Sequence, residues 1–396
     1  MIRKAMDGNM AAAEGARLAR VQVVAAYPIT PQTPIVEHLA SLIAKGRLAA
    51  RYINVESEHS ALCAVIGASL VGARVFTATA SAGLALMHEV TGVAAGCRLP
   101  IVMPIVNRAL PSPWSLWCDH SDSMGERDQG WIQFYAENSQ EVLDLVILAY
   151  RLAEDKRILL PVNICLDGFF LSHTTEAVLV PEQGEVDAFL PPYCGQNLIL
   201  DPQEPLAVNV LTGPEIFTEI KYQQKQAMDR VFPVMEEIGL EFARRFGRFY
   251  PPFSAEFCED AEVILVTMGT MSGVARYVVK GLREQGKRVG LLKLRVFRPF
   301  PGKEISRVLR KAKAVAVIDR SAGLGSLGPL SLEIKGALYT SGLDEAPMVR
   351  SYIAGLGGRD ITEETIGQVI EDTFGTLGNP RDEYASKWID LRKEEC

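Results

Sequence analysis

The sequence predicts an α/β protein whose first domain is a doubly wound parallel sheet and whose second domain is a further α/β unit. Short apolar runs alternate with longer segments of helical periodicity along most of the chain, which is the pattern of βαβ units. The runs are almost continuously apolar, as in Leu99–Val106, and such strands are buried on both faces of a sheet. The segment Tyr250-Pro251-Pro252 marks a boundary, so we expect domains at 1–248 and 255–396.

A stiff loop near the start of the chain organises the first domain. The loop Tyr27–Pro34 follows an apolar run, Val21–Val24. Its prolines lack the N–H that a strand needs, so they fix an extended turn that presents the hydroxyl of Thr30. In open parallel sheets, ligands bind outside the carboxyl ends of the strands, where this loop is expected. A proline-rich connector without a function explains the spacing equally well.

The apolar periodicity gives the order of the other elements. In the first domain it predicts a helix at 6–20, a helix after Pro34, a strand at 51–55, a helix from 56 to Gly72, a strand at 75–80, a helix at 84–95, a strand at 99–106, a polar loop at 107–129, a helix at 139–154 and a strand at 159–166. In the second domain it predicts a strand at 263–266, a tight turn at 269–273, a helix at 274–285, a strand at 289–294, a helix at 303–312 and a strand at 314–319.

The segment 175–215 interrupts this alternation. It is rich in proline and has few periodic residues, which predicts an extended excursion over the surface or over a partner. A long helix from about Thr218 to Gly247 is expected to follow.

Composition excludes several classes of protein. The chain is 48% hydrophobic and 22% charged, with a net charge of -7, as in ordinary soluble globular proteins. No basic cluster stands out, so nucleic-acid binding is disfavoured. No apolar run reaches the roughly 18 residues of a membrane span. The first residues lack the apolar core of a signal peptide, so we expect a cytoplasmic location.

The cysteines do not form a metal or cluster motif. They are Cys63, Cys97, Cys118, Cys165, Cys194, Cys258 and Cys396. No two make a CxxC pair, so neither a zinc site nor an iron–sulfur cluster is indicated on this chain. Scattered cysteines with apolar neighbours are typical core residues of a reduced protein.

Two clusters at the ends of predicted strands could bind ligands. Glu56–Ser60 opens a helix, where Ser57 suits an N-cap and an acid suits the helix dipole. Alternatively, one of its carboxylates points into a cleft and meets a ligand nitrogen. Arg108 follows an apolar strand, and its planar guanidinium could bind a carboxylate through two hydrogen bonds. A lone arginine, however, more often makes a structural ion pair.

A third cluster is the loop Trp114–Asp122, which is dense in aromatic and ionisable residues. Asp119, His120 and Asp122 could ligate a metal, but no further histidine or cysteine follows at a matching spacing. We therefore leave the role of this loop open.

Nine motifs together resemble one family. They are Tyr27–Pro31, Val55–Ala61, Leu84–Glu89, Leu99–Met103, Val106–Leu110, Trp117–Asp122, Arg127–Gln133, Leu166–His173 and Phe297–Pro301. They are similar to motifs in the alpha subunit of pyruvate:ferredoxin oxidoreductase and related 2-oxoacid:acceptor oxidoreductases. The resemblance covers nearly the whole chain.

The resemblance implies CoA-dependent oxidative decarboxylation of a 2-oxoacid on thiamine diphosphate, with electrons passing through iron–sulfur clusters to ferredoxin or another acceptor. The alpha chain of this family holds the aminopyrimidine ring, while a beta subunit holds the diphosphate and Mg²⁺ with a Gly-Asp-Gly motif. Gamma and ferredoxin-like iron–sulfur subunits complete the assembly. This chain has neither Gly-Asp-Gly nor cluster cysteines, as the resemblance leads us to expect.

The resemblance also implies roles for individual residues. Glu58 would hydrogen-bond the pyrimidine ring and favour the imino tautomer whose nitrogen deprotonates the thiazolium carbon. Pro28 would contact the same cofactor, and Thr30 and Arg108 would bind the carboxylate and oxo group of the substrate. No metal ligand is implied on this chain. The domain at 255–396 would resemble a transketolase C-terminal domain.

Departures from the family pattern bear on the substrate. Ser81-Ala82-Gly83 stands where typical pyruvate enzymes read Ser-Gln-Gly, and Pro111-Ser112 stands where they commonly read Ser-Ala. Thr30 is retained, which disfavours oxalate, because enzymes for oxalate carry an arginine there. Pyruvate is therefore expected first. An aromatic or branched 2-oxoacid such as phenylglyoxylate, with NAD as the final acceptor, is the alternative.

Two other classes of function compete with this interpretation. A scaffold subunit could keep the fold without the site, but the joint presence of Glu58, Thr30 and Arg108 argues against it. A self-contained α/β dehydrogenase is disfavoured because no dinucleotide fingerprint is complete.

Overall fold

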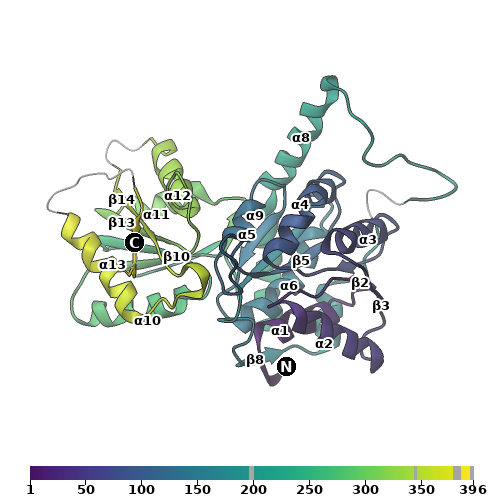
Figure 1. The fold of residues 1–396 in the computed structure, drawn as a ribbon, viewed down its shortest axis with the longest axis horizontal. Helices are drawn as coiled ribbons and strands as arrows, with labels where there is room; N and C mark the ends of the chain where they lie inside the picture. Colours follow the sequence, from purple (N-terminus) through teal and green to yellow (C-terminus); the bar gives the residue numbers. More distant parts are fainter. Residues whose placement is uncertain (196–199, 343–345, 378–384, 393–396) are drawn as a thin grey trace.

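The computed structural model describes residues 1–195, 200–342, 346–377 and 385–392, which form two α/β units side by side (Figure 1). The first unit has a seven-stranded sheet in the order β12-β6-β7-β5-β4-β2-β3. Its strands are β2 (Val23–Ala25), β3 (Arg51–Ile53), β4 (Val75–Phe76), β5 (Val102–Asn107), β6 (Ile132–Tyr135), β7 (Val162–Asp167) and β12 (Val296–Arg298). Every neighbouring pair is parallel except β12 with β6. The predicted parallel sheet is confirmed.

Helices cover both faces of this sheet, as a doubly wound fold requires. Those that share the core on one face are α1 (Gly8–Leu18), α2 (Thr33–Ala44), α6 (Ser139–Ala153) and α9 (Val231–Phe246). Those on the opposite face are α3 (Glu58–Leu70) and α4 (Ser81–Gly96). Strands β5 and β7 are buried along their whole length, in agreement with their nearly continuous apolar sequence.

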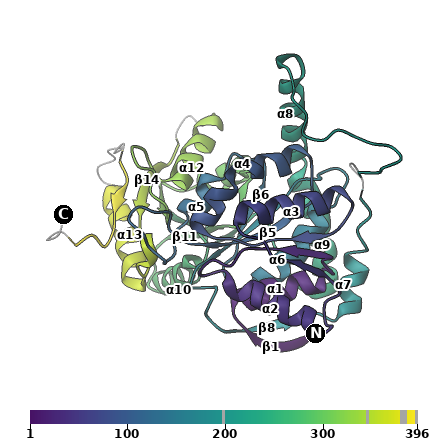
Figure 2. The same cartoon turned by 45° about the vertical axis from the view of Figure 1, so that its right-hand side comes forward.

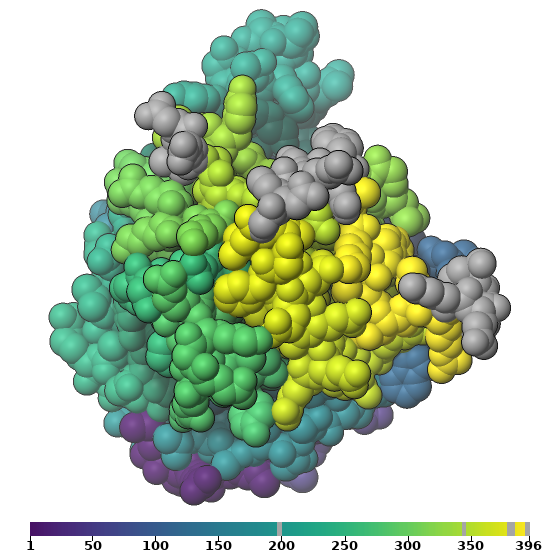
Figure 3. All heavy atoms as spheres, turned by 90° about the vertical axis from the view of Figure 1, so that its left-hand side faces the viewer, coloured from purple at the N-terminus to yellow at the C-terminus, as the bar shows by residue number. Residues whose placement is uncertain are grey.

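The second unit is also built from a sheet and helices, and its six-stranded sheet has the order β15-β14-β13-β10-β11-β9. Its strands are β9 (Phe253–Glu256), β10 (Val263–Met268), β11 (Val289–Leu294), β13 (Ala314–Asp319), β14 (Met348–Ile353) and β15 (Lys387–Trp388). Its helices are α10 (Met271–Glu284), α11 (Gly302–Leu309), α12 (Pro329–Thr340), the 3₁₀ turn η1 (Leu356–Gly358) and α13 (Glu363–Thr376). Figure 3 looks onto this unit, whose green to yellow segments form most of the near face.

The two units are joined by a strand and by buried charges. Strand β12 comes from the second unit in sequence but extends the sheet of the first. Beside it, the Lys293 ammonium lies 2.5 Å from Glu141 Oε1 and 2.6 Å from Glu137 Oε2, and Arg295 Nη2 lies 2.9 Å from Glu141 Oε1. The glutamates belong to the first unit and the cations to the second, so each unit neutralises charges that the other buries.

Replacing Glu141 with glutamine is expected to lower the free energy of unfolding at pH 7 by about 3–5 kcal/mol. The change leaves the buried Arg295 without a carboxylate and leaves Lys293 with Glu137 as its carboxylate partner. Burial alone would raise the pKa of Glu141, but Arg295 and Lys293 lower it to about 2. Its contribution to stability is therefore complete above about pH 4.5 and is lost as the pH falls toward 2.

Urea unfolding at a series of pH values checks this prediction. The variant is expected to show a flatter decline of stability in that acidic range than the parent protein. The exposed Glu37, replaced by glutamine, is the control and should change neither quantity. A loss below about 1 kcal/mol for Glu141→Gln would contradict the role assigned to the buried pair.

Two predicted segments differ from the structure near their ends. The helix expected at 6–20 is α1, and residues before it form a strand, β1 (Ile2–Met6). Asp7 ends this strand and caps α1, since its Oδ1 accepts a hydrogen bond of 2.7 Å from Met10 N. The loop expected at 107–129 contains a short helix, α5 (Ser121–Gly125), and strand β6 follows it.

The segment 175–215 is more regular than predicted. It begins with β8 (Glu176–Val180), which pairs antiparallel with β1, and with α7 (Gln183–Phe189). Residues 190–195 and 200–213 contain no helix, and residues 196–199 lie outside the described part of the chain. The periodicity of 183–189 was too short to be distinguished from a loop.

The single helix expected from Thr218 to Gly247 is two helices. α8 (Pro214–Asp229) ends and α9 begins at Arg230. Pro233 explains the break, because proline has no N–H to donate and its ring clashes with the carbonyl four residues earlier. α8 projects from the body of the protein (Figures 1 and 2). In the parts of the chain that the structure describes, no helix has the length and apolar character needed to cross a bilayer.

The cysteines are partly as expected. Those buried in the core are Cys97, Cys118, Cys165 and Cys258, whereas Cys63 and Cys194 are exposed. Cys396 lies outside the described residues.

Candidate functional site

The loop Tyr27–Pro34 lies at the carboxyl end of β2, where the sequence places it. Two buried side chains hold it from below: Asn9 Nδ2 donates a 3.0 Å hydrogen bond to Pro31 O, and Gln32 Nε2 donates one of 3.0 Å to Ala78 O. Pro28 and Thr30 are exposed at the surface of the loop. The loop is therefore fixed from inside and presents both residues outward.

Glu58 is the first residue of α3, directly after strand β3 and its turn. The N-cap is Ser57, whose Oγ accepts a 3.2 Å hydrogen bond from Ser60 N. Glu58 is only 7% exposed, yet its carboxylate makes no hydrogen bond or ion pair within the described residues. The residue is mostly covered while its carboxylate has no partner among the described residues, so it is a candidate to accept a hydrogen bond from a ligand.

The space in front of Glu58 depends on a glycine. A Cβ atom at Gly83 would lie 2.5 Å from Glu58 Oε1 and 2.7 Å from Thr79 Oγ1. Thr79 Oγ1 is itself buried and has no hydrogen-bond partner among the described residues. The absence of a side chain at Gly83 thus leaves room for the carboxylate beside an unsatisfied hydroxyl.

Arg108 follows the last residue of β5 and reaches back to the loop. Its Nη1 donates to Thr30 O at 2.8 Å and its Nε donates to Ser115 O at 3.2 Å. The side chain is 5% exposed, and burial lowers the pKa of its guanidinium. Nη2 has no partner within the described part of the chain. The structure therefore brings Arg108 to Thr30 through the carbonyl of Thr30.

Asp122 connects these residues to α4. Its carboxylate accepts hydrogen bonds from four N–H groups: those of Ser81 N, Arg108 N, Asn107 Nδ2 and Ser123 N, at 2.7 to 3.0 Å. Burial raises the pKa of Asp122 to about 6, although the four donors favour its charged form. Ser81 also donates its hydroxyl to Ala109 O at 2.6 Å. The start of α4, which carries Gly83, is thereby tied to the segment that carries Arg108.

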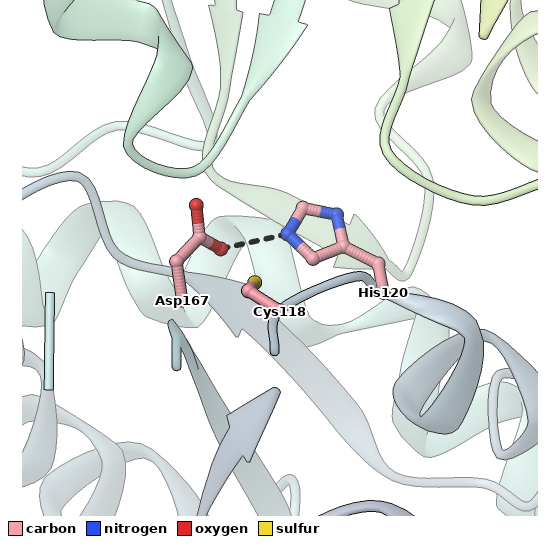
Figure 4. A group of neighbouring side chains, drawn as sticks. All are labelled: Cys118, His120 and Asp167. Atoms are coloured by element: carbon pink, nitrogen blue, oxygen red, sulfur yellow. Dashed lines mark hydrogen bonds and ion pairs between the residues drawn. The ribbon is translucent and has the colours of Figure 1, made fainter. Parts of the chain in front are cut away.

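The three residues considered as metal ligands are not brought together. Asp119 accepts hydrogen bonds from Ser121 N and Oγ at 2.9 and 2.5 Å, and Asp122 faces the N–H donors just described. His120 turns instead toward Cys118 and Asp167, with its Nε2 2.7 Å from Asp167 Oδ1 (Figure 4).

The group of Cys118, His120 and Asp167 has ligand atoms within 4.8 Å of one another. Arg320 already supplies a positive charge there: its Nη1 lies 3.0 Å from Asp167 Oδ2 and 3.7 Å from Cys118 Sγ. Although burial would raise the pKa of Asp167, Arg320 and His120 hold it well below its usual range. We interpret the group as a buried ion pair and not as a metal centre.

This buried ion pair also links the units. Arg320 belongs to the second unit, and its carbonyl accepts a 2.8 Å hydrogen bond from His120 N. Thr270 N, at the turn before α10, donates to Asp167 Oδ2 at 3.1 Å. Gly269 precedes it with φ of +74° and approaches Asp167 closely. The turn at 269–273 is therefore used for packing against Asp167.

Sequence reasoning missed the roles of Asp167 and Arg320 in this region, and it named Ser81 without predicting its hydrogen bond to Asp122. The partners of Ser81, Asp167 and Arg320 lie 41, 47 and 153 positions away in the chain, and no local spacing signals such contacts.

Comparison with known proteins identifies the family. Residues 14–239, more than half of the chain, match the family model described as "Pyruvate flavodoxin/ferredoxin oxidoreductase, thiamine diP-bdg". The chain belongs to this pyruvate flavodoxin/ferredoxin oxidoreductase family. Residues 261–366 match a second model, "Pyruvate:ferredoxin oxidoreductase core domain II". The chain is thus an oxidoreductase subunit with a thiamine diphosphate-binding domain, and that domain contains Thr30, Glu58 and Arg108.

Relatives of this family are similar over their whole length. The chain is 48% identical to "Pyruvate synthase subunit PorA" of Methanothermobacter thermautotrophicus, covering 100% of both chains. It is 46% identical to "Ketoisovalerate oxidoreductase subunit VorA" of Pyrococcus horikoshii, covering 99% of both.

Two solved structures share the fold. One is "2-oxoglutarate:ferredoxin oxidoreductase from Magnetococcus marinus", with a TM-score of 0.73 and 21% identity, covering 94% of this chain and 65% of that one. The other is a "Split gene transketolase", with a TM-score of 0.54 and 14% identity, covering 92% and 98%. The expected fold is confirmed: an α/β unit of the thiamine diphosphate-binding kind is followed by a second α/β unit that resembles a transketolase domain.

Proposed function

We propose that this chain is the alpha subunit of a 2-oxoacid:ferredoxin oxidoreductase that converts pyruvate and CoA into acetyl-CoA and CO₂ and passes two electrons to ferredoxin. The observation that carries the proposal is Glu58, a residue only 7% exposed whose carboxylate has no partner among the described residues, within a domain of the thiamine diphosphate-binding family. The proposal places the enzyme in the cytoplasm.

The residues around Glu58 fit the aminopyrimidine of thiamine diphosphate. Glu58 offers a carboxylate to a ring N–H. The missing side chain at Gly83 leaves room for that carboxylate, and Thr79 Oγ1 is an unsatisfied polar atom beside the same position. Pro28, exposed on the loop, is proposed as a further contact. When bound, the cofactor supplies the carbanion chemistry of decarboxylation. Glu58 supplies the charged hydrogen-bond acceptor that sets the tautomer of its ring.

Thr30 and Arg108 are proposed to bind the carboxylate and oxo group of the 2-oxoacid. Two carbonyls hold the Arg108 guanidinium in place, which leaves Nη2 to meet an anion. The hydroxyl of Thr30 is exposed on the rigid loop. These groups recognise features common to all 2-oxoacids, so they set the class of substrate and not its member.

The remaining parts of the site are proposed to come from partner subunits. A beta subunit would hold the diphosphate and Mg²⁺, and gamma and ferredoxin-like subunits would carry the iron–sulfur clusters. Within this chain we propose domains at 1–248 and 255–396, with β12 reaching from the second to the first sheet.

Calorimetric titration with thiamine diphosphate and Mg²⁺ tests the shared site. The isolated chain is expected to bind weakly, because it lacks ligands for the diphosphate, whereas the complex purified with its native partners should bind tightly and turn over pyruvate. Micromolar or tighter binding by the isolated chain would contradict the shared site.

A branched 2-oxoacid is the second candidate, because ketoisovalerate oxidoreductase subunits are nearly as similar as pyruvate synthase subunits. The ratio of kcat/KM for pyruvate and ketoisovalerate on the complex separates the two. Phenylglyoxylate, the aromatic alternative, belongs in the same series.

Replacing Gly83 with alanine is expected to lower turnover by about 10²-fold, the cost of misplacing a catalytic group by about 1 Å. The new Cβ would lie 2.5 Å from Glu58 Oε1 and 2.8 Å from its Cγ, so the carboxylate must move. Gly67→Ala is the matched control, since Gly67 lies on the same helix as Glu58 and has no atom within 4 Å of its Cβ position. Equal turnover in both variants would remove Gly83 from the site.

A further inference from the structure

A groove of about 620 Å³ lies on the second unit, between α11 and α12. The two helices are neighbours in Figure 1 and pack closely, because a Cβ at Gly302 would lie 3.1 Å from Ala337 Cβ. Gly336, in contrast, has no atom within 4 Å of its Cβ position. Phe300 lies at the groove as well. The volume is within the range of small-molecule sites, which is roughly 300–1,000 Å³.

Three cations line this groove: Lys303, Arg307 and Arg310. Their spacing of four and three residues places them on one side of α11 and its C-cap. All three are exposed, and none makes an ion pair or side-chain hydrogen bond within the described residues. Among the described residues that line the groove, the one carboxylate is that of Glu333, and it is already bound to Arg298 Nη2 at 2.6 Å.

This arrangement differs from that of other arginines in the same unit. Arg276, Arg283 and Arg320 each hold a carboxylate, so the usual state of an arginine here is paired. A set of unpaired cations around one concavity has a net positive field in a chain whose overall charge is -7. Gly302 and Lys303, in the first turn of α11, also line the groove. Gly302 N donates to Phe300 O, whereas Lys303 N has no backbone acceptor among the described residues, and the amino end of a helix favours an anion.

We propose that the groove between α11 and α12 binds a ligand with two adjacent phosphates, such as a nucleoside diphosphate or free pyrophosphate. Two guanidinium groups and an ammonium match the charge of a diphosphate, and arginine pairs with phosphate oxygens in a bidentate manner. Phe300 and Ala337 offer apolar surface for a base. This ligand site is separate from Glu58, Thr30 and Arg108, which do not line the groove.

The test uses the native complex saturated with thiamine diphosphate and Mg²⁺, so that the cofactor's own diphosphate site is filled. Calorimetry is then carried out with pyrophosphate, ADP and adenosine. We expect pyrophosphate and ADP to bind, adenosine not to bind, and the affinity to fall as salt is added. Tighter binding of ADP than of pyrophosphate would identify a nucleotide as the ligand, and equal binding would identify the diphosphate alone.

The triple variant Lys303→Gln, Arg307→Gln, Arg310→Gln is expected to weaken binding by at least about tenfold, since it removes every charged donor of the groove. The control, Lys45→Gln, Arg47→Gln, Lys156→Gln, changes the net charge equally at exposed cations that also lack partners among the described residues. It should bind as the parent does. No saturable binding to the parent, or equal binding by both variants, would overturn the proposal. The readout does not involve turnover, so it is independent of the proposed reaction.

Discussion

Replacing Glu58 with glutamine is expected to reduce the rate of 2-oxoacid decarboxylation by about 10²–10⁴-fold, the usual contribution of an acid–base group. The amide has nearly the same shape as the carboxylate, but it carries no charge and presents N–H donors in place of one oxygen. Since Glu58 makes no hydrogen bond within the described residues, no group in that part of the chain loses a partner. The complex should therefore assemble normally.

Single-turnover decarboxylation by the intact complex is the measurement that checks this. Glu56→Gln is the matched control: Glu56 is a neighbouring glutamate that is exposed and accepts a hydrogen bond from Ser60 Oγ. It should retain nearly full activity. A loss smaller than about tenfold for Glu58→Gln would move the role to another carboxylate.

Replacing Arg320 with methionine is expected to destabilise the protein by about 3–5 kcal/mol, because it leaves the buried Asp167 carboxylate without its cationic partner. Arg320 is 3% exposed and Asp167 is 1% exposed. Arg320 and His120 keep the pKa of Asp167 low against the effect of burial. The contribution of the pair is present above about pH 3.9, the ordinary pKa of aspartate, and is lost as the pH falls below it.

Unfolding in urea, followed for the parent and for a double-mutant cycle, measures this effect. Adding Asp167→Asn to Arg320→Met should recover part of the loss, since the uncompensated charge is then gone. Arg288→Met, which removes an arginine from an exposed pair with Glu262, should leave the midpoint nearly unchanged. Equal losses for the single and the double variant would show that packing, and not charge, sets the cost.

Most of the fold could be predicted because its strands are apolar and its helices periodic. Strands such as β5 and β10 are buried throughout, and their sequences consist almost entirely of apolar residues. β1 could not be predicted, since Ile2–Met6 alternates weakly and gains its pairing only from β8, far along the chain. The break between α8 and α9 was predictable in principle from Pro233.

The candidate site was predictable only in its local parts. The loop with Thr30 and the helix start at Glu58 follow from proline and capping signals that span a few residues. The link through Asp122 and the ion pair of Asp167 with Arg320 join segments that are distant in sequence. Such contacts depend on which sheet edge each segment reaches, and residue spacing does not encode that.

Strand β12 has a consequence for how the protein is made. The ribosome releases the chain from its amino end, so six strands of the first sheet emerge long before Val296–Arg298. During that interval β6 is an edge strand with unpaired N–H and C=O groups, which is a template for pairing with other chains. Expression of a fragment that ends near residue 250 should therefore give an aggregation-prone product, and the nascent protein gains protection of this edge only when the second unit has begun to emerge.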